Sequence, residues 1–354
     1  MTTRQWIFAL LRSALWDEPL PEPLPSECVP QIVEEARRQT VAGLLIDQLL
    51  KYNVQMPRPL LLEAFSLLEA IKRKNTRMNE EVARFAKLMS SAKLAYIVVK
   101  GQTLAAHYPN PLLRMPGDID FLVNDYFRAK RVLEQEWNVS LPSVMAEKEI
   151  AFVHDNVPYE LHTYLTDFGW FRHRRYWDRV LRENHPDSIT IGEEQVAVME
   201  PTLYAAYVFI HLFFHFVHEG IGLRHLCDWA ILIHHERDRI NSGQLSSVLK
   251  ELGLLKAYRA FGSVLTDYLG LNSFPMEITQ RDRTFQQCIL NDVFNGGNFG
   301  GGNRQVKNYG LRYKAETLWL TLKNSIRYYR LAPLEMTFMT YRRVMVNVKL
   351  LLHS

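Results

Sequence analysis

The chain has 354 residues, of which 47% are apolar and 23% are charged, and its formal net charge is +4. This composition excludes a disordered or collagen-like protein, and the length is enough for about two domains. Three cysteines, Cys28, Cys227 and Cys288, are scattered without metal-site spacing and cannot all pair, which favours a reducing compartment.

Two apolar stretches bear on localisation. Arg4 and Arg12 interrupt the apolar residues near the N-terminus, which leaves no apolar core of a signal peptide. Residues 205–217 are strongly apolar, but they contain two histidines and are shorter than the ~20 residues that cross a bilayer. We therefore expect a cytoplasmic protein with no membrane insertion.

The first 92 residues predict helices. Apolar residues recur at helical spacing over 2–16, and alternating prolines in 18–25 then impose an extended link. Helical patterns return at about 30–53 and at 60–91, where one long helix or two are expected. We assign residues 1–92 to a helical N-terminal region.

Residues 93–200 predict strands interspersed with helices. A crossover helix is expected at 126–137, between two strands that carry acidic residues. The expected strands lie at about 96–99, 118–123, 139–144, 149–154, 157–164 and 195–199. From residue 201 the pattern is helical again, so 201–354 form a helical C-terminal region and the fold class is α+β.

Asp118 and Asp120 stand two positions apart in an apolar run. A strand turns alternate side chains to opposite faces, so both acids would point the same way while Ile119 and Phe121 anchor the other face. Two close carboxylates resist ionisation unless a cation lies between them, and Mg²⁺ or Mn²⁺ would serve. A solvated strand end, where neither acid touches anything, is the alternative.

Two further motifs fit the same chemistry. Lys100 and Gly101 follow a buried strand, where a glycine backbone can approach a triphosphate and the lysine can meet its charge. Glu160 and His162 share a strand face, and a third carboxylate on an adjacent strand would complete a two-metal site. Such sites hold ions about 3.5–4 Å apart for in-line displacement at phosphorus.

These motifs, in this order, resemble a poorly characterised family of bacterial nucleotidyltransferases within the polymerase-beta-like superfamily. The resemblance covers about residues 60–240. It also includes these residues: Tyr108, Arg114, His211, His215 and 223–228. It implies a mixed sheet flanked by helices, Mg²⁺, and transfer of a nucleoside monophosphate from a nucleoside triphosphate. It further implies that Asp118 and Asp120 are the metal-binding acids and that Glu160 is the third carboxylate.

The chain departs from the superfamily pattern after the first strand. Members usually carry Gly-Ser there and reach the first acid about a dozen residues later, whereas this chain has Gly101-Gln102, and Asp118 follows 17 positions after Gly101. Thr103 could replace the missing serine, or Lys100 could supply the lost affinity. Arg114 either reaches the phosphates or pairs with one of the acids. The sequence leaves these alternatives open.

His211 and His215 share one face of a predicted helix. Leu212 stands where a zinc hydrolase motif has glutamate, which disfavours a zinc site. The two histidines, with His162, could instead contact the acceptor, or they could satisfy buried polar groups. Asp228 lies one helical turn after Arg224, which fits a structural ion pair. The resemblance marks this cluster without giving it a role.

The last part of the chain is basic. Residues 303–354 contain ten Lys or Arg and two Glu, a pattern that can attract an anionic partner such as RNA, a nucleotide or a membrane surface. Its aromatic residues recur at helical spacing and are more simply explained as core, so nucleic acid is the less favoured partner. The glycine-rich run 295–303 lacks the ending of a phosphate-binding loop, and a mobile surface loop is expected there.

The sequence therefore predicts a Mg²⁺-dependent nucleotidyltransferase that acts on a nucleoside triphosphate and an unidentified acceptor. A sugar, an antibiotic hydroxyl, a protein side chain and an RNA end all remain open as acceptors. The alternative is a nucleotide-binding or partner-binding module that has kept the fold and lost the chemistry. A zinc hydrolase built on His211 and His215 ranks last.

Overall fold

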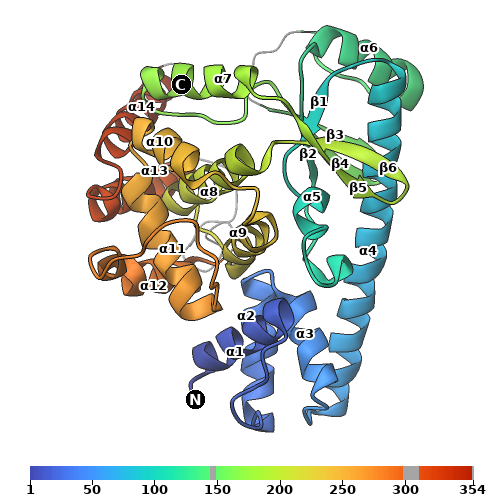
Figure 1. Cartoon of the computed structure of the whole chain (residues 1–354), viewed down its shortest axis with the longest axis vertical. Coiled ribbons are helices and arrows are strands. Elements are labelled where there is room, and N and C mark those ends of the chain that lie inside the picture. Colours follow the sequence, from blue (N-terminus) through green and yellow to red (C-terminus); the bar gives the residue numbers. More distant parts are fainter. Residues whose placement is uncertain (144–148, 298–310, 353–354) are drawn as a thin grey trace. The chain divides into compact units, whose positions relative to one another are not determined.

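In the computed structural model, residues 1–143, 149–297 and 311–352 are described, and the chain divides into two compact units (Figure 1). The first unit comprises residues 1–33, 42–167 and 184–204. The remaining described residues form the second unit. Each unit combines segments that lie far apart in the sequence, and the division at residues 92 and 200 stays a prediction about domains.

The helices predicted before the sheet are confirmed. They are α1 (Thr3–Trp16), α2 (Val29–Arg38), α3 (Ala42–Lys51) and α4 (Arg58–Ser91), with a 3-10 turn η1 (Ser26–Cys28). Thr2 and Gln5 form a capping box at the start of α1. Residues 60–91 belong to one helix of 34 residues, which begins at a proline-containing first turn.

The predicted mixed sheet is also confirmed. Its strands are β1 (Tyr96–Val98), β2 (Ile119–Val123), β3 (Glu149–His154) and β4 (Val157–His162), in the order β1-β2-β4-β3. β2 and β4 are parallel, and the two outer pairings are antiparallel. The crossover helix α6 (Tyr126–Trp137) has the predicted bounds. The short helices α5 (Gln102–Ala105) and η2 (Pro111–Leu113) connect β1 to β2.

One face of the sheet packs against α4 and α6, and Phe85 of α4 is at the centre of that core. The Phe85 ring lies 4.3 Å from the ring of Phe121 and 5.3 Å from that of Tyr96, measured between centroids. Tyr159 and Leu161 of β4 are fully buried in the same cluster. Because side chains alternate along a strand, the residues between these, among them Asp120 and Glu160, point to the other face.

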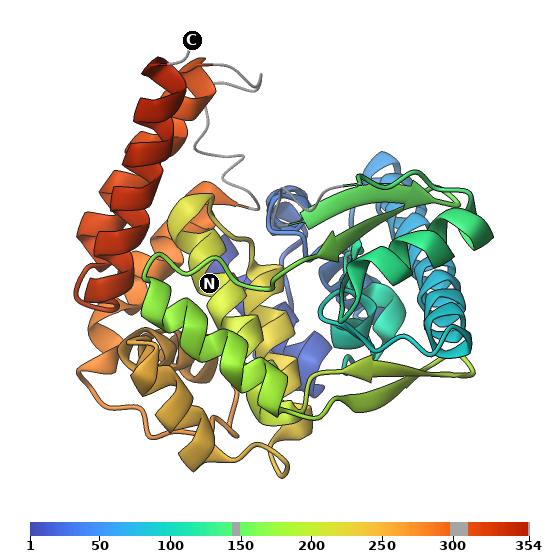
Figure 2. The same cartoon turned by 90° about the horizontal axis from the view of Figure 1, so that it is seen from above.

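The second unit is helical, as predicted for residues beyond 201. It contains α8 (Pro201–His218), whose first turn belongs to the first unit, and the unpredicted α7 (Phe171–Glu183). The other elements are α9 (Leu223–Glu236), α10 (Ser242–Glu251), α11 (Leu255–Leu269), η3 (Asp282–Phe285), α12 (Gln286–Gly296), α13 (Leu311–Tyr328) and α14 (Pro333–Leu352). The last two run side by side (Figure 2).

The predicted strand at 139–144 is wrong for residues 139–143, which form a loop, and residue 144 lies outside the described residues. The Leu141 amide donates to Glu134 at 3.0 Å and the Tyr126 hydroxyl donates to the Pro142 carbonyl at 2.5 Å, so α6 holds this segment. The hairpin of β5 (Asp187–Ile191) and β6 (Glu194–Val198) was predicted only in its second strand.

Two expectations from the sequence concern the end of the chain and the membrane. Most of the glycine-rich run, residues 298–303, lies outside the described residues, while Gly296 ends α12. Within the part of the chain that the structure describes, every helix is too short or too polar to cross a membrane.

We expect Phe85→Ala to lower the free energy of unfolding by about 3–5 kcal/mol, because it removes the ring on which three elements pack. Phe65→Ala is the matched control, since Phe65 lies on the same helix but is 55% exposed, and its loss should cost no more than about 0.5 kcal/mol. Urea denaturation followed by circular dichroism measures both. Similar losses in the two variants would show that Phe85 is not the centre of the core.

Candidate active site

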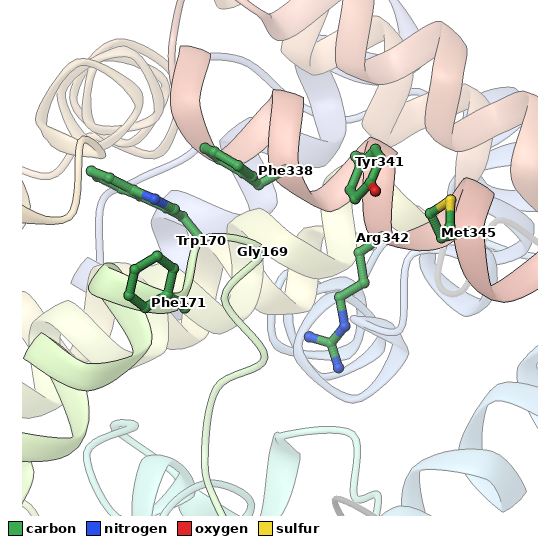
Figure 3. Close-up of a pocket in the computed structure, with 7 residues that line it drawn as sticks. All are labelled: Gly169, Trp170, Phe171, Phe338, Tyr341, Arg342 and Met345. Atoms are coloured by element: carbon green, nitrogen blue, oxygen red, sulfur yellow. The ribbon is translucent and has the colours of Figure 1, made fainter.

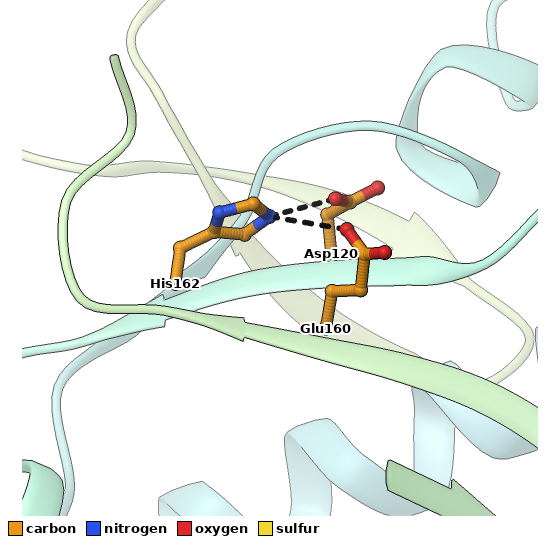
Figure 4. Close-up of side chains that lie close together, drawn as sticks. All are labelled: Asp120, Glu160 and His162. Atoms are coloured by element: carbon orange, nitrogen blue, oxygen red, sulfur yellow. Dashed lines mark hydrogen bonds and ion pairs between the residues drawn. The ribbon is translucent and has the colours of Figure 1, made fainter. Parts of the chain in front are cut away.

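The parallel pairing of β2 with β4 brings the predicted acids together. Asp120 and Glu160 are register partners on these two strands. His162 stands two positions after Glu160 and therefore projects from the same face of the sheet. Figure 4 shows the imidazole and the two carboxylates pointing toward one another from neighbouring strands.

The three side chains form a compact group. His162 Nε2 lies 2.7 Å from Asp120 Oδ1 and 3.8 Å from Glu160 Oε2. One ligand atom from each residue lies within 4.8 Å of the others, and no further group of this kind occurs among the residues with described side chains. The side chains of Asp120 and His162 are buried, whereas that of Glu160 is 28% exposed. The group is thus open to solvent on the Glu160 side.

Asp120 is a carboxylate held between the Lys100 ammonium group and the His162 ring. Lys100 Nζ lies 2.8 Å from the same oxygen that contacts His162. Burial by itself would raise the pKa of Asp120, but the charge of Lys100 and the hydrogen bond from His162 outweigh it and hold the pKa well below its ordinary value. Asp120 therefore keeps its negative charge inside the protein.

Glu160 has the opposite electrostatic environment. Its burial, and then the charges of Asp120, Asp118 and Glu149, raise its pKa to about 8, with Lys100 opposing them in part. A carboxyl group crowded by other carboxylates gains most from a bound cation. Two carboxylates and an imidazole on one face are ligands that fit a divalent metal ion.

Asp118 stands immediately before the strand that carries Asp120. β2 begins at Ile119. It is half-buried and lies outside the group of three, although its charge acts on Glu160. His162, which the sequence places on the acceptor side, takes the third position. A metal-binding role for Asp118 stays a prediction.

The turn at Lys100 and Gly101 requires glycine. Gly101 has φ +63° and ψ −116°, and a Cβ atom there would lie 2.9 Å from the carbonyl oxygen of Asp118. L-residues rarely adopt this backbone conformation. The close packing against Asp118 fixes Lys100 beside the start of β2, so this glycine has a structural reason that is independent of any nucleotide.

The residues after Gly101 are engaged within the protein. The Thr103 hydroxyl is fully buried, donates to the Lys100 carbonyl at 3.0 Å and lies 2.7 Å from the Tyr204 hydroxyl. Gln102 donates its amide to Asn79 of α4 at 2.5 Å. Thr103 therefore does not present its hydroxyl as the missing serine would, because the scaffold already binds it.

Arg114 is buried in the loop before β2. Its side chain is 5% exposed, and the amide of Asn75 donates to its backbone carbonyl at 2.7 Å. Asn75 also donates to the Leu112 carbonyl, so α4 holds the loop that leads into β2. The two roles that the sequence leaves open for Arg114 both stay predictions.

The histidine cluster lies in the second unit. The rings of His211 and His215 on α8 are 4.3 Å apart, and His215 Nδ1 lies 3.2 Å from Glu219. Asp228 is buried on α9. These residues do not join any group of three metal ligands among the residues whose side chains are described, which gives the zinc interpretation no support. An acceptor-side role for His211 and His215 stays a prediction.

The second unit also contains a cavity of about 400 Å³ that the sequence did not indicate (Figure 3). It is lined by Gly169, Trp170, Phe171, Phe338, Tyr341, Arg342 and Met345. Buried Glu335 accepts a hydrogen bond from the Gly169 amide at 2.8 Å and contacts His173, which fixes one wall against α14. The two walls are more than 160 residues apart in sequence, so no local pattern could reveal the cavity.

Comparison with known proteins identifies the family of the chain. A family model described as "Uncharacterised nucleotidyltransferase" matches residues 26–270, more than half of the chain. The chain belongs to this family. Membership confirms the resemblance inferred from the sequence and places the chain among the nucleotidyltransferases.

The other comparisons add little to this family assignment. No curated protein matches the chain. One solved structure, an antigenic nucleotidyltransferase-like protein from Paracoccidioides brasiliensis, is similar at 14% identity and a TM-score of 0.36. The match covers 55% of this chain and 92% of that chain.

We expect Gly101→Ala to destabilise the protein by about 2–5 kcal/mol, the combined cost of backbone strain and overpacking. Gly192→Ala in the β5–β6 turn is the matched control: its φ is +62°, but a Cβ atom there meets nothing within 4 Å. Strain alone should cost it about 1–2 kcal/mol. Equal losses in chemical denaturation would show that the packing against Asp118 does not matter.

We expect the stability of the metal-free protein to depend on Glu160 and pH. Its pKa of about 8 in the folded chain exceeds its ordinary value of 4.5. Its contribution is therefore full below pH 4.5 and is lost as the pH rises through about 8. Glu160→Gln removes this loss, so its Tm in EDTA should rise relative to that of the natural protein between pH 5 and pH 9.

Exposed Glu193→Gln serves as the control for this comparison. Its Tm should follow that of the natural protein at every pH. A Tm difference for Glu160→Gln that stays constant from pH 5 to pH 9 would contradict the raised pKa.

Proposed function

We propose that the protein transfers a nucleoside monophosphate from a nucleoside triphosphate to an acceptor, with a divalent metal ion as cofactor. The observation that carries the proposal is the buried Asp120 carboxylate facing Glu160, a crowded carboxyl group, across two parallel strands. Membership of a nucleotidyltransferase family supports the same reaction class.

Asp120 and Glu160 would hold the metal, and Asp118 would add a ligand from the entry to β2. A bound Mg²⁺ or Mn²⁺ supplies charge neutralisation for the triphosphate and orients the reacting oxygens. The two carboxylates differ in how firmly the protein holds them. Asp120 is fixed by its partners, whereas Glu160 is more exposed and can adjust to a ligand.

Lys100 would stabilise charge on the phosphate oxygens. Its ammonium group contacts Asp120, so it stands beside the proposed metal site. The Gly101 amide, held by the same turn, is the second group that we assign to the phosphates. Fixed positive groups of this kind are effective because they need no rearrangement during the reaction. Arg114 is the third candidate for this role.

Glu160 would also accept the proton of the acceptor. With the ion bound, Glu160 would be ionised, and a carboxylate oxygen that does not bind the ion would be available as the proton acceptor. In the proposed step the acceptor oxygen forms a bond to the α-phosphorus and the bond to pyrophosphate breaks. The proton released from the acceptor passes to Glu160.

A second candidate is nucleotide binding without transfer. The observation that favours it is Gln102, which stands in the position of the usual serine and donates its amide to α4. Calorimetry with several triphosphates and Mg²⁺ or Mn²⁺, combined with a pyrophosphate assay, separates the two candidates. Binding without pyrophosphate release across a broad acceptor panel would favour the module.

We expect Glu160→Gln to reduce nucleotide transfer by about 10²–10⁴-fold, because it removes both a ligand and the proton acceptor. The variant should fold as well as the natural protein at pH 8 or better, since the crowded charge is gone. The assay follows transfer of label from α-labelled triphosphates to products in a cell lysate.

Glu193→Gln is the control here as well, and it should keep full activity. Asp120→Asn is a less clean test, because it leaves Lys100 and His162 without their buried carboxylate partner and is expected to lower the Tm. Equal transfer by Glu160→Gln and Glu193→Gln would refute the proposed role of Glu160.

A further inference from the structure

His162, the third side chain of the group, offers a nitrogen ligand, and this bears on which metal ion the site prefers. Building on the proposed function, we propose that His162 binds the metal directly through Nε2, that Glu149 orients the ring, and that the site prefers Mn²⁺ to Mg²⁺. The observations that carry this are the burial of the imidazole and the carboxylates near both of its nitrogens.

The Nε2 atom faces the two carboxylates. It lies 2.7 Å from Asp120 Oδ1 and 3.8 Å from Glu160 Oε2. The side chain is 3% exposed and extends from the end of β4, so packing fixes its direction. In the metal-free chain this nitrogen donates a hydrogen bond to Asp120. A metal ion bound by Asp120 and Glu160 would take the place of the donated proton.

The Nδ1 atom lies near a different carboxylate. Glu149 on β3 is the register partner of His162, and its Oε2 lies 3.8 Å from Nδ1. Nδ1 is buried and has no hydrogen-bond partner in the described part of the chain. The Glu149 side chain is 45% exposed and projects beside the ring from the neighbouring strand. A histidine that binds a metal usually donates its other ring N–H to a carboxylate, which fixes the ring orientation.

The donor set distinguishes between the two candidate ions. Mg²⁺ strongly prefers oxygen ligands in regular octahedral geometry and usually keeps several waters. Imidazole nitrogen suits transition metals, while carboxylates and phosphate oxygens suit Mn²⁺ as well as Mg²⁺. A site with two carboxylates and one imidazole therefore fits Mn²⁺, and the nitrogen ligand is what disfavours Mg²⁺.

The direct test is pulsed electron paramagnetic resonance of the full chain loaded with Mn²⁺. We expect a ¹⁴N modulation from a directly bound imidazole, replaced by the ¹⁵N pattern when the protein is made with ¹⁵N-histidine. The signal should disappear in His162→Gln and persist in His185→Gln, since His185 is an exposed histidine of the same unit. The isotope comparison needs no variant, so it shows whether a histidine nitrogen binds the ion even if His162→Gln folds poorly.

Calorimetry with each ion alone gives the preference. We expect the natural protein to bind Mn²⁺ at least about tenfold more tightly than Mg²⁺, and His162→Gln to bind both about equally. Glu149→Gln should weaken Mn²⁺ binding by about 10–100-fold while keeping the nitrogen signal.

The outcomes separate this inference from the proposed function. Mn²⁺ bound without a histidine nitrogen signal, or Mg²⁺ bound more tightly than Mn²⁺, would overturn the inference and leave the nucleotidyltransferase proposal intact. No binding of either ion, with or without a triphosphate, would overturn both.

Discussion

The parallel pairing of β2 with β4 is the constraint on which the site depends. It sets Asp120 opposite Glu160, and it is fixed from the other face by Phe121, Tyr159 and Leu161, which pack toward Phe85 of α4. A slip of one residue would turn the carboxylates into this aromatic core. The core therefore stabilises an arrangement of like charges that the acidic residues alone would oppose.

The strand alternation could be read from the sequence, but the start of β2 and the register of the β3–β4 hairpin could not. Alternation correctly placed Asp120 apart from Phe121, and Glu160 with His162. The pattern could not show that β2 starts at Ile119, which leaves Asp118 outside the strand. Nor could it show that Glu149 would pair with His162, because that pairing depends on the β3–β4 hairpin register. The family resemblance supplied the reaction class, not these contacts.

The residues after β1 have two physical explanations. The Lys100-Gly101 pair fits a phosphate-binding role, and the same pair satisfies a local backbone requirement through the positive φ of Gly101 and its approach to Asp118. From the sequence, Thr103 could be proposed as a replacement for serine. Its hydroxyl contacts Tyr204, which lies 101 positions away, so no local pattern reveals that contact. Only the folded chain shows that its hydroxyl is already bound.

The two facing carboxyl groups differ in how they affect folding, and this difference follows from their neighbours. Asp120 has Lys100 and His162 within 2.8 Å, so its charge is compensated inside the protein. Glu160 receives no comparable compensation, and the charges of Asp120 and Asp118 act against its ionisation. A cation bound between them would relieve Glu160 and would compete with Lys100 for Asp120. Asp120 thus holds the metal-free site together. Glu160 supplies the affinity for an ion, because the ionisation of Glu160 is unfavourable without the ion and becomes favourable when the ion is bound.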